Sequence, residues 1–81
     1  MTFHYVYILP SVYNPDRFYV GTTDDLRTRL KKHNGGHVDY TAQFRPWRIN
    51  TAIAFANKEK ADAFERYLKT ASGRAFARKR L

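Results

Sequence analysis

The chain has 81 residues and a formal net charge of +8, from 15 Lys plus Arg against 7 Asp plus Glu. This length predicts one small domain over residues 1–81. The absence of Cys excludes disulfides and thiolate zinc sites and favours a reducing compartment. No apolar run approaches the roughly 20 residues that span a bilayer, and residues 1–4 lack the basic region of a signal peptide. We therefore expect a cytoplasmic protein without membrane association.

The positive charge predicts a partner that carries phosphate. A basic surface attracts nucleic-acid backbones and speeds encounter with them. Together with the six Tyr, six Phe and one Trp, it favours nucleic-acid binding, with DNA preferred as the partner. The alternatives are a basic surface directed at ribosomes or acidic lipids, and aromatic side chains that only fill the core.

Residues 4–9 and 18–22 are predicted to form the two strands of a hairpin. Residues 4–9 are dense in β-branched and aromatic side chains, which favour strands, and Pro10 ends this strand. The connection over residues 11–17 has the composition of a turn.

A helix is predicted to follow the hairpin. Thr23 is the expected N-cap, and Asp24 and Asp25 would lie where the helix dipole favours acids. Arg29 and His33 are four residues apart and therefore share one helix face. The Asn-Gly-Gly run that follows His33 ends the helix.

The second half of the chain contains a further strand and two further helices. Residues 37–47 are expected to be an irregular connection. Residues 48–56 alternate in polarity and predict a third strand. Asn57 is expected to cap a helix that ends near residue 71, and a short basic helix is expected over residues 74–80. The fold class is therefore α+β: a three-stranded antiparallel sheet flanked by helices, in the order β-β-α-β-α with a short terminal helix.

The chain contains the side chains that phosphodiester hydrolysis needs. That reaction requires an activated water and groups that neutralise charge around the phosphorus. Arg29 and His33 can supply cations, and Glu65 is a carboxylate within an apolar helical pattern, between Phe64 and Leu68. Mg²⁺ often binds through one or two carboxylates, waters and a substrate phosphate, so one Glu suffices for a single ion.

Four segments carry a resemblance to a known family. Tyr5-Val6-Tyr7 and Tyr19-Val20-Gly21 are two spaced triplets, residues 29–35 read Arg-Leu-Lys-Lys-His-Asn-Gly, and residues 64–69 contain a Glu-x-x-x-Lys pattern. Together they resemble the GIY-YIG nuclease family, close to its small single-domain bacterial members, over nearly the whole chain. Tyr5 replaces the Gly of the first triplet, a substitution that resembles those members.

This resemblance implies a fold and a chemistry. The sheet would carry the active site on one face, and Glu65 would hold a single divalent ion, Mg²⁺ or Mn²⁺. The implied catalytic set is Tyr7, Tyr19, Arg29 and His33. Tyr7 is our first choice for the base that acts on the attacking water, with Tyr19 orienting that water and Arg29 binding the scissile phosphate.

Each of these residues also has a structural interpretation. Tyr7 and Tyr19 would serve as core aromatics, Arg29 as a solvated helix residue, and His33 as a helix-end His stabilised by the helix dipole. A Tyr has a pKa near 10 and is a poor base at neutral pH unless nearby cations lower that pKa. Arg29, His33 and the metal are the cations available for this.

Further candidates surround this set. Glu65 and Lys69 could form a surface i,i+4 pair, and Lys69 could instead contact phosphate. Tyr40 lies in the connection where the family often adds a polar active-site residue. The basic side chains expected to contact nucleic acid are Arg17, Arg27, Lys31, Lys32, Arg45, Arg48, Arg74, Arg78, Lys79 and Arg80.

The sequence supports competing functions. The first is a DNA endonuclease with a role in repair or recombination. The second is a non-catalytic or partner-dependent nucleic-acid-binding module with the same fold. The third is a nuclease or binder of RNA, because no motif in the sequence recognises a 2′-hydroxyl specifically and so none decides between DNA and RNA. A protein partner would supply targeting. For a nuclease we expect the candidate residues to converge on one concave surface, and Glu65 on the opposite side of the sheet from Arg29 would contradict that interpretation.

Overall fold

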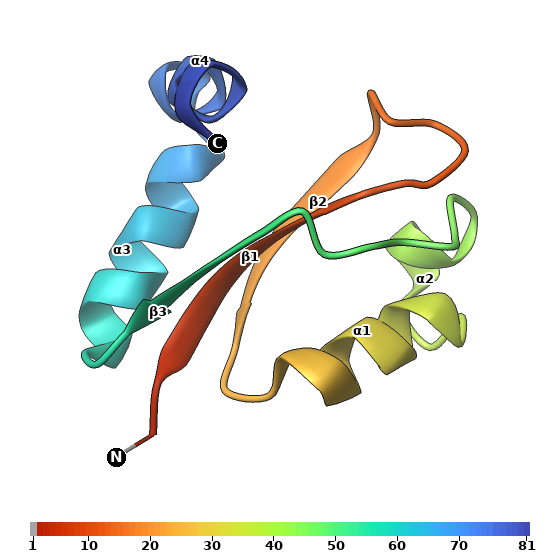
Figure 1. Ribbon diagram of the computed structural model, residues 1–81, viewed down its shortest axis with the longest axis horizontal. Helices are drawn as coiled ribbons and strands as arrows, with labels where there is room; N and C mark the ends of the chain where they lie inside the picture. Colours follow the sequence, from red (N-terminus) through yellow and green to blue (C-terminus); the bar gives the residue numbers. More distant parts are fainter. Residues whose placement is uncertain (1) are drawn as a thin grey trace.

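The computed structural model describes residues 2–81, and Met1, the first residue of the predicted domain, lies outside them. Figure 1 shows a central sheet with helices on both sides. The elements are β1 (His4–Pro10), β2 (Phe18–Thr23), α1 (Leu26–Asn34), α2 (Asp39–Ala42), β3 (Thr51–Phe55), α3 (Lys58–Leu68) and α4 (Ala71–Arg80).

The sheet has the predicted three antiparallel strands, in the order β2-β1-β3. The α+β prediction is therefore confirmed, and β2 is an edge strand. In the register of β1 and β2, Tyr7 faces Gly21 and Leu9 faces Tyr19. Side chains two residues apart on a strand share a face, so Tyr7 and Tyr19 lie on the same side of the sheet.

One face of the sheet is covered by α1, α2 and the segment that contains Trp47 (Figure 1). Here Tyr7, Leu9 and Trp47 are buried, and Leu26 and Leu30 of α1 pack against them. The i,i+4 spacing of these two leucines places both on one helix face, and it thus fixes α1 on the face that carries Tyr7.

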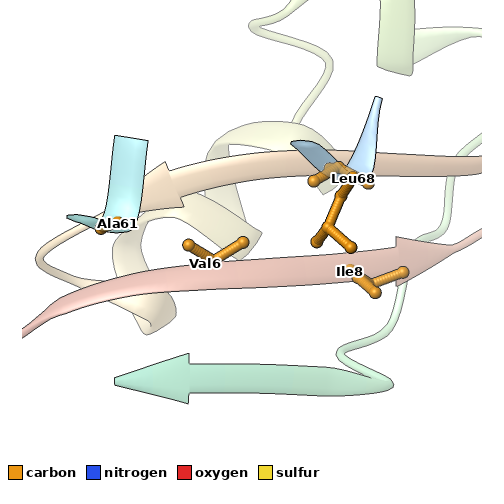
Figure 2. Close-up of a cluster of buried hydrophobic side chains, with 5 residues drawn as sticks. Val6, Ile8, Ala61 and Leu68 are labelled. Atoms are coloured by element: carbon orange, nitrogen blue, oxygen red, sulfur yellow. The ribbon is translucent and has the colours of Figure 1, made fainter. Parts of the chain in front are cut away.

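The opposite face is covered by α3 and α4. Val6 and Ile8 of β1 pack with Ala61 and Leu68 of α3 in a buried cluster (Figure 2), which Val20 completes. Because β1 alternates between the two faces, both of its sides are buried and the sheet lies between two layers of helices.

The helix boundaries differ from the predicted ones at four points. One is the end of α3 at Leu68, before the predicted end near residue 71. Asp25, not Thr23, caps α1, because the Asp25 side chain accepts a hydrogen bond from Thr28 N at 3.1 Å. Residues 39–42, expected to be irregular, form α2. The final helix begins at Ala71, three residues before the predicted start, because Thr70 caps it through Gly73 N at 3.0 Å.

Gly73 permits the sharp approach of α4 to α3. It is buried, and a Cβ at this position would overlap the backbone carbonyl of Tyr67 near the end of α3. Gly73 lies within the first turn of α4. No helix in residues 2–81 is long and apolar enough to cross a membrane.

Candidate active site

Tyr7 and His33 form the centre of the candidate site. The Tyr7 hydroxyl lies 3.1 Å from Nε2 of His33 in a buried hydrogen bond. The exposed fractions of the two side chains are 2% and 0%. The Tyr7 ring reaches across Gly21, where a Cβ would come within 2.5 Å of the hydroxyl. Glycine at position 21 is therefore what lets this hydroxyl lie over the edge strand.

The hydrogen bonds assign the tautomer of His33. Thr41 Oγ1 donates its one proton to the carbonyl of Val38 at 3.2 Å. Toward His33, this oxygen can therefore only accept a hydrogen bond. Nδ1 of His33, 2.8 Å from Thr41 Oγ1, therefore carries the proton. Nε2 has a lone pair that accepts the hydrogen bond from the Tyr7 hydroxyl. A chain of hydrogen bonds therefore runs from Tyr7 through His33 and Thr41 to the Val38 carbonyl.

The segment that supplies Thr41 is held by Trp47. Trp47 Nε1 donates to the carbonyl of Thr41 at 2.8 Å. Asn34 in turn accepts from Trp47 N at 2.6 Å and donates to its carbonyl at 3.1 Å. The buried Trp47 is a core residue, and it fixes α2 against the end of α1.

The pKa shifts at the centre run against the sequence expectation. Burial raises the pKa of Tyr7 to about 12; Tyr19 and Glu65 add to the rise and Arg29 opposes it. Burial outweighs Arg29, so the condition under which Tyr7 would be a good base at neutral pH is not met by Arg29. Burial, followed by the charge of Arg29, lowers the pKa of His33. His33 is thus a neutral acceptor at neutral pH, and not the cation we expected.

Tyr19 and Arg29 border the same centre. The Tyr19 ring lies 4.8 Å from the His33 ring and 6.2 Å from the Tyr7 ring, between centroids. Arg29 is half-buried beside Tyr7, Leu9 and Leu30. The catalytic candidates from β1, β2 and α1 therefore gather on one face of the sheet.

Glu65 approaches from the other face. Its helix, α3, packs on the side of the sheet opposite α1 (Figure 1), so the expectation of a single face is wrong. This placement counts against the nuclease hypothesis. The groove at the edge of the sheet is nevertheless lined by Tyr19 and Tyr40 on one side and by Lys69 of the α3 end on the other, so groups from both layers meet beside β2. The charges of both Arg29 and Glu65 act on Tyr7, which lies over the edge strand β2.

The carboxylate of Glu65 is already paired. Lys69 Nζ donates to Glu65 Oε2 at 2.7 Å, and the Glu65 side chain is 20% exposed. Among residues 2–81, no three His, Cys, Asp or Glu side chains group together to hold a metal ion. A metal here would therefore have one protein carboxylate, an arrangement that suits a largely hydrated Mg²⁺ or Mn²⁺ completed by phosphate.

The remaining candidates lie around this centre. Tyr40 on α2 is 55% exposed, with its ring 6.4 Å from that of Tyr19. The basic side chains expected to contact nucleic acid are all exposed: Arg17, Arg27, Lys31, Lys32, Arg45, Arg48, Arg74, Arg78, Lys79 and Arg80. Of these, Arg17, Arg74 and Arg78 line a groove that also contains Tyr19 and Tyr40.

Thr41 is the residue that sequence reasoning missed. It lies eight residues after His33, but α1 ends at Asn34 and Thr41 lies on the separate helix α2, so no single helix or strand relates the two residues. Its position depends on the contact with Trp47, so no local pattern could have marked it.

Comparison with known proteins identifies the family of this chain. Residues 3–80 match the GIY-YIG catalytic domain. The chain belongs to the GIY-YIG family. Proteins with this domain include nucleases, and GIY-YIG endonucleases are generally dependent on divalent metal ions.

Two kinds of relative are similar to this GIY-YIG chain. A "UPF0213 protein" of Halalkalibacterium halodurans is 39% identical over 72 residues, which cover 88% of this chain and 74% of the relative. The "Structure-specific endonuclease subunit SLX1" of Scheffersomyces stipitis is 38% identical over 71 residues, which cover 79% of this chain and 21% of the relative. The chain thus spans about a fifth of the length of that SLX1 protein and most of the length of the bacterial one.

Proposed function

We propose that this chain is an endonuclease that hydrolyses DNA phosphodiester bonds at the Tyr7–His33 centre. The observation that carries the proposal is the buried hydrogen bond from Tyr7 to a His33 whose other nitrogen is occupied by Thr41. A hydroxyl paired with an oriented neutral base is the arrangement that activates a nucleophile or a water. The similarity to an endonuclease subunit supports the same reaction.

Protons move along the hydrogen-bond chain in this proposal. With a pKa of about 12, Tyr7 is neutral at neutral pH and cannot take a proton without releasing its own. The attacking water gives a proton to the Tyr7 oxygen while the Tyr7 hydroxyl proton passes to Nε2 of His33. The water oxygen bonds to phosphorus, the bond to the leaving oxygen breaks, and that oxygen takes a proton from solvent. His33 then releases its added proton to solvent, which restores its neutral form and closes the cycle.

Arg29 is proposed to bind the scissile phosphate. It is half-buried beside Tyr7, where the attacking water would form its bond to phosphorus. A guanidinium donates two parallel hydrogen bonds to a phosphate, and it offsets the charge that develops on the equatorial oxygens.

Glu65 is proposed to hold a single divalent ion. It is the carboxylate whose charge acts on Tyr7, and its side chain is partly exposed. When bound, Mg²⁺ or Mn²⁺ would neutralise phosphate charge at the site. Lys69 must release Glu65 or share it, and this exchange would keep the ion weakly held until substrate arrives.

A second candidate function is a non-catalytic or partner-dependent nucleic-acid-binding module. The ion pair of Lys69 with Glu65 favours it, because it occupies the carboxylate that a metal requires. The word "subunit" in the name of the SLX1 relative describes a protein that works in an assembly, and a protein partner is part of our proposal here as well. Cytoplasmic location and a role in repair or recombination remain predictions.

A cleavage assay separates the two functions. Branched, flapped, single-stranded and duplex DNA, with RNA of the same sequences, would be incubated with the chain in Mg²⁺, Mn²⁺ or EDTA. The endonuclease cuts DNA with either metal and not in EDTA, and Glu65→Gln abolishes cutting. Glu59→Gln, an exposed change in the first turn of the same helix, leaves it intact. Binding of every substrate without cutting would instead support the module.

A further inference from the structure

A groove runs past the free edge of β2, beside the candidate active site. It has a volume of about 490 Å³, within the roughly 300–1,000 Å³ range of small-ligand sites. Its walls come from both layers of the molecule. Tyr19 and Tyr40 line it on the α2 side, Lys69 lines it at the end of α3, and Arg74 and Arg78 line it from α4.

The groove is continuous with the candidate site through two of its lining residues. The Tyr19 ring is a wall of the groove and lies 4.8 Å from the His33 ring, between centroids. Lys69 lines the groove and is paired with Glu65 at 2.7 Å. A chain of nucleotides whose scissile phosphate lies at Tyr7 would therefore enter or leave through this groove.

The charge of the groove matches a phosphate backbone. Four cations, Arg17, Lys69, Arg74 and Arg78, line it against one acid, Asp16. Arg74 and Arg78 are one helical turn apart on α4 and share a face. The Arg17 guanidinium lies 4.8 Å from the centroid of the Phe44 ring, which holds this cation in place.

Aromatic rings accompany the charge. Tyr40 is 55% exposed and Phe18 is 40% exposed, and both line the groove. A basic groove with exposed rings is the arrangement that binds unpaired nucleotides, because phosphates follow the cations and bases stack on the rings. A duplex keeps its bases paired and stacked inside, so it could use the cations but not Tyr40.

We propose that this groove is a subsite for the unpaired nucleotides next to the scissile phosphate, with phosphate on Arg74 and Arg78 and a base stacked on Tyr40. The inference rests on the proposed function and adds a substrate class to it: DNA with a single-stranded segment at the cut. The tail helix α4 is then part of the binding site.

The test measures binding separately from cutting. Fluorescence anisotropy in EDTA, at one fixed salt concentration, would follow a labelled oligo-dT of about 12 nucleotides and a blunt duplex of equal length. Arg74→Ala/Arg78→Ala should weaken oligo-dT binding at least about tenfold and duplex binding less. Lys60→Ala/Arg66→Ala removes the same charge from two exposed positions of α3 outside the groove, and should weaken oligo-dT binding about twofold or less.

Base stacking is tested in the same assay by substitutions of single tyrosines. Tyr40→Ala should weaken oligo-dT binding about fivefold or more, and Tyr40→Phe should retain it. Tyr13→Ala, at a 77% exposed ring outside the groove, is the control and should have no effect. Melting temperatures would verify folding, and Arg74→Gln/Arg78→Gln repeats the charge test if the Ala pair unfolds.

Three results would overturn the inference: equal weakening by the two charge pairs, equal loss for duplex and oligo-dT, or unchanged binding by Tyr40→Ala. Any of these leaves the cleavage assay untouched, so failure of the subsite and failure of the endonuclease remain distinguishable.

Discussion

The Tyr7 hydroxyl on β1 lies 3.1 Å from Nε2 of His33 near the end of α1, although 26 residues separate the two. Three local features of the structure produce this contact. Gly21 leaves room above the edge strand, Leu26 and Leu30 dock α1 on the face that carries Tyr7, and Thr41 holds the ring of His33. Each can be changed alone, which makes the proton chain testable in parts.

Thr41→Val should reduce turnover without removing any proposed substrate contact. Val has the shape of Thr but leaves Nδ1–H of the buried His33 without its acceptor. The expected costs are about 1–3 kcal/mol of stability and at least about tenfold in kcat, as for residues that orient a functional His. Thr41→Ser keeps the hydroxyl and should restore most of the rate. Equal rates for the Val and Ser variants would exclude the positioning role.

Gly21→Ala should disrupt the site through a steric clash. The new Cβ would come within 2.5 Å of the Tyr7 hydroxyl and 3.0 Å of the Tyr19 ring, so the Tyr7 ring must move away from His33. We expect a loss of about 1–3 kcal/mol in the free energy of unfolding, together with the loss of most cleavage. Chemical denaturation and a cleavage assay on the same sample would check this. Wild-type turnover in this variant would contradict the assigned position of the Tyr7 hydroxyl.

Stability and activity should both fall as the pH is lowered from neutral. Burial and Arg29 lower the pKa of His33 in the folded chain, whereas the unfolded chain keeps a value near 6.5. As the pH falls, the unfolded state therefore binds a proton before the folded state does. The contribution of His33 to the free energy of unfolding is complete above about pH 6.5 and is lost as the pH falls through the folded pKa. Protonated His33 also cannot accept from Tyr7.

Thermal melting and kcat/KM measured across this pH range would check this prediction. His37→Gln, at an exposed position, is the control and should keep the pH dependence. A melting temperature and a rate that stay flat from neutral to mildly acidic pH would count against a buried, neutral His33.

Arg29→Ala should lower kcat far more than it weakens DNA binding. A contact that strengthens in the transition state acts on turnover, and we expect a loss of about 10²–10³-fold in kcat. Arg27→Ala removes an exposed charge from the same helix and, as an expected backbone contact, should weaken DNA binding modestly with little change in kcat. Equal falls in turnover and affinity for Arg29→Ala would make Arg29 an ordinary backbone contact.

Local sequence patterns predicted the sheet well because strand formation here follows from local composition. The dense β-branched and aromatic run before Pro10 and the alternation before Asn57 both form strands. The site residues Tyr7, Tyr19 and His33 were found through the family motifs, and the structure places their rings together.

Tertiary contacts explain what the sequence did not predict. Residues 39–42 are helical in a segment held by the Trp47 indole, a contact that no local pattern contains. The side of the sheet on which α3 packs depends on how the chain crosses from β3, so the approach of Glu65 from the second face was also missed. The raised pKa of Tyr7 follows from burial, which composition does not specify.

The central claim is that Tyr7 passes the proton of the attacking water to His33, and one measurement tests it most directly. Single-turnover cleavage of a flapped DNA by the wild-type chain and by Tyr7→Phe would be compared in Mg²⁺ as a function of pH, with affinity and melting temperature measured alongside. The account predicts that Tyr7→Phe loses about 10²–10⁴-fold in rate with fold and affinity unchanged, and that wild-type activity rises from acidic toward alkaline pH. Near-normal cleavage by Tyr7→Phe would contradict the account and move the role to Tyr19 or His33.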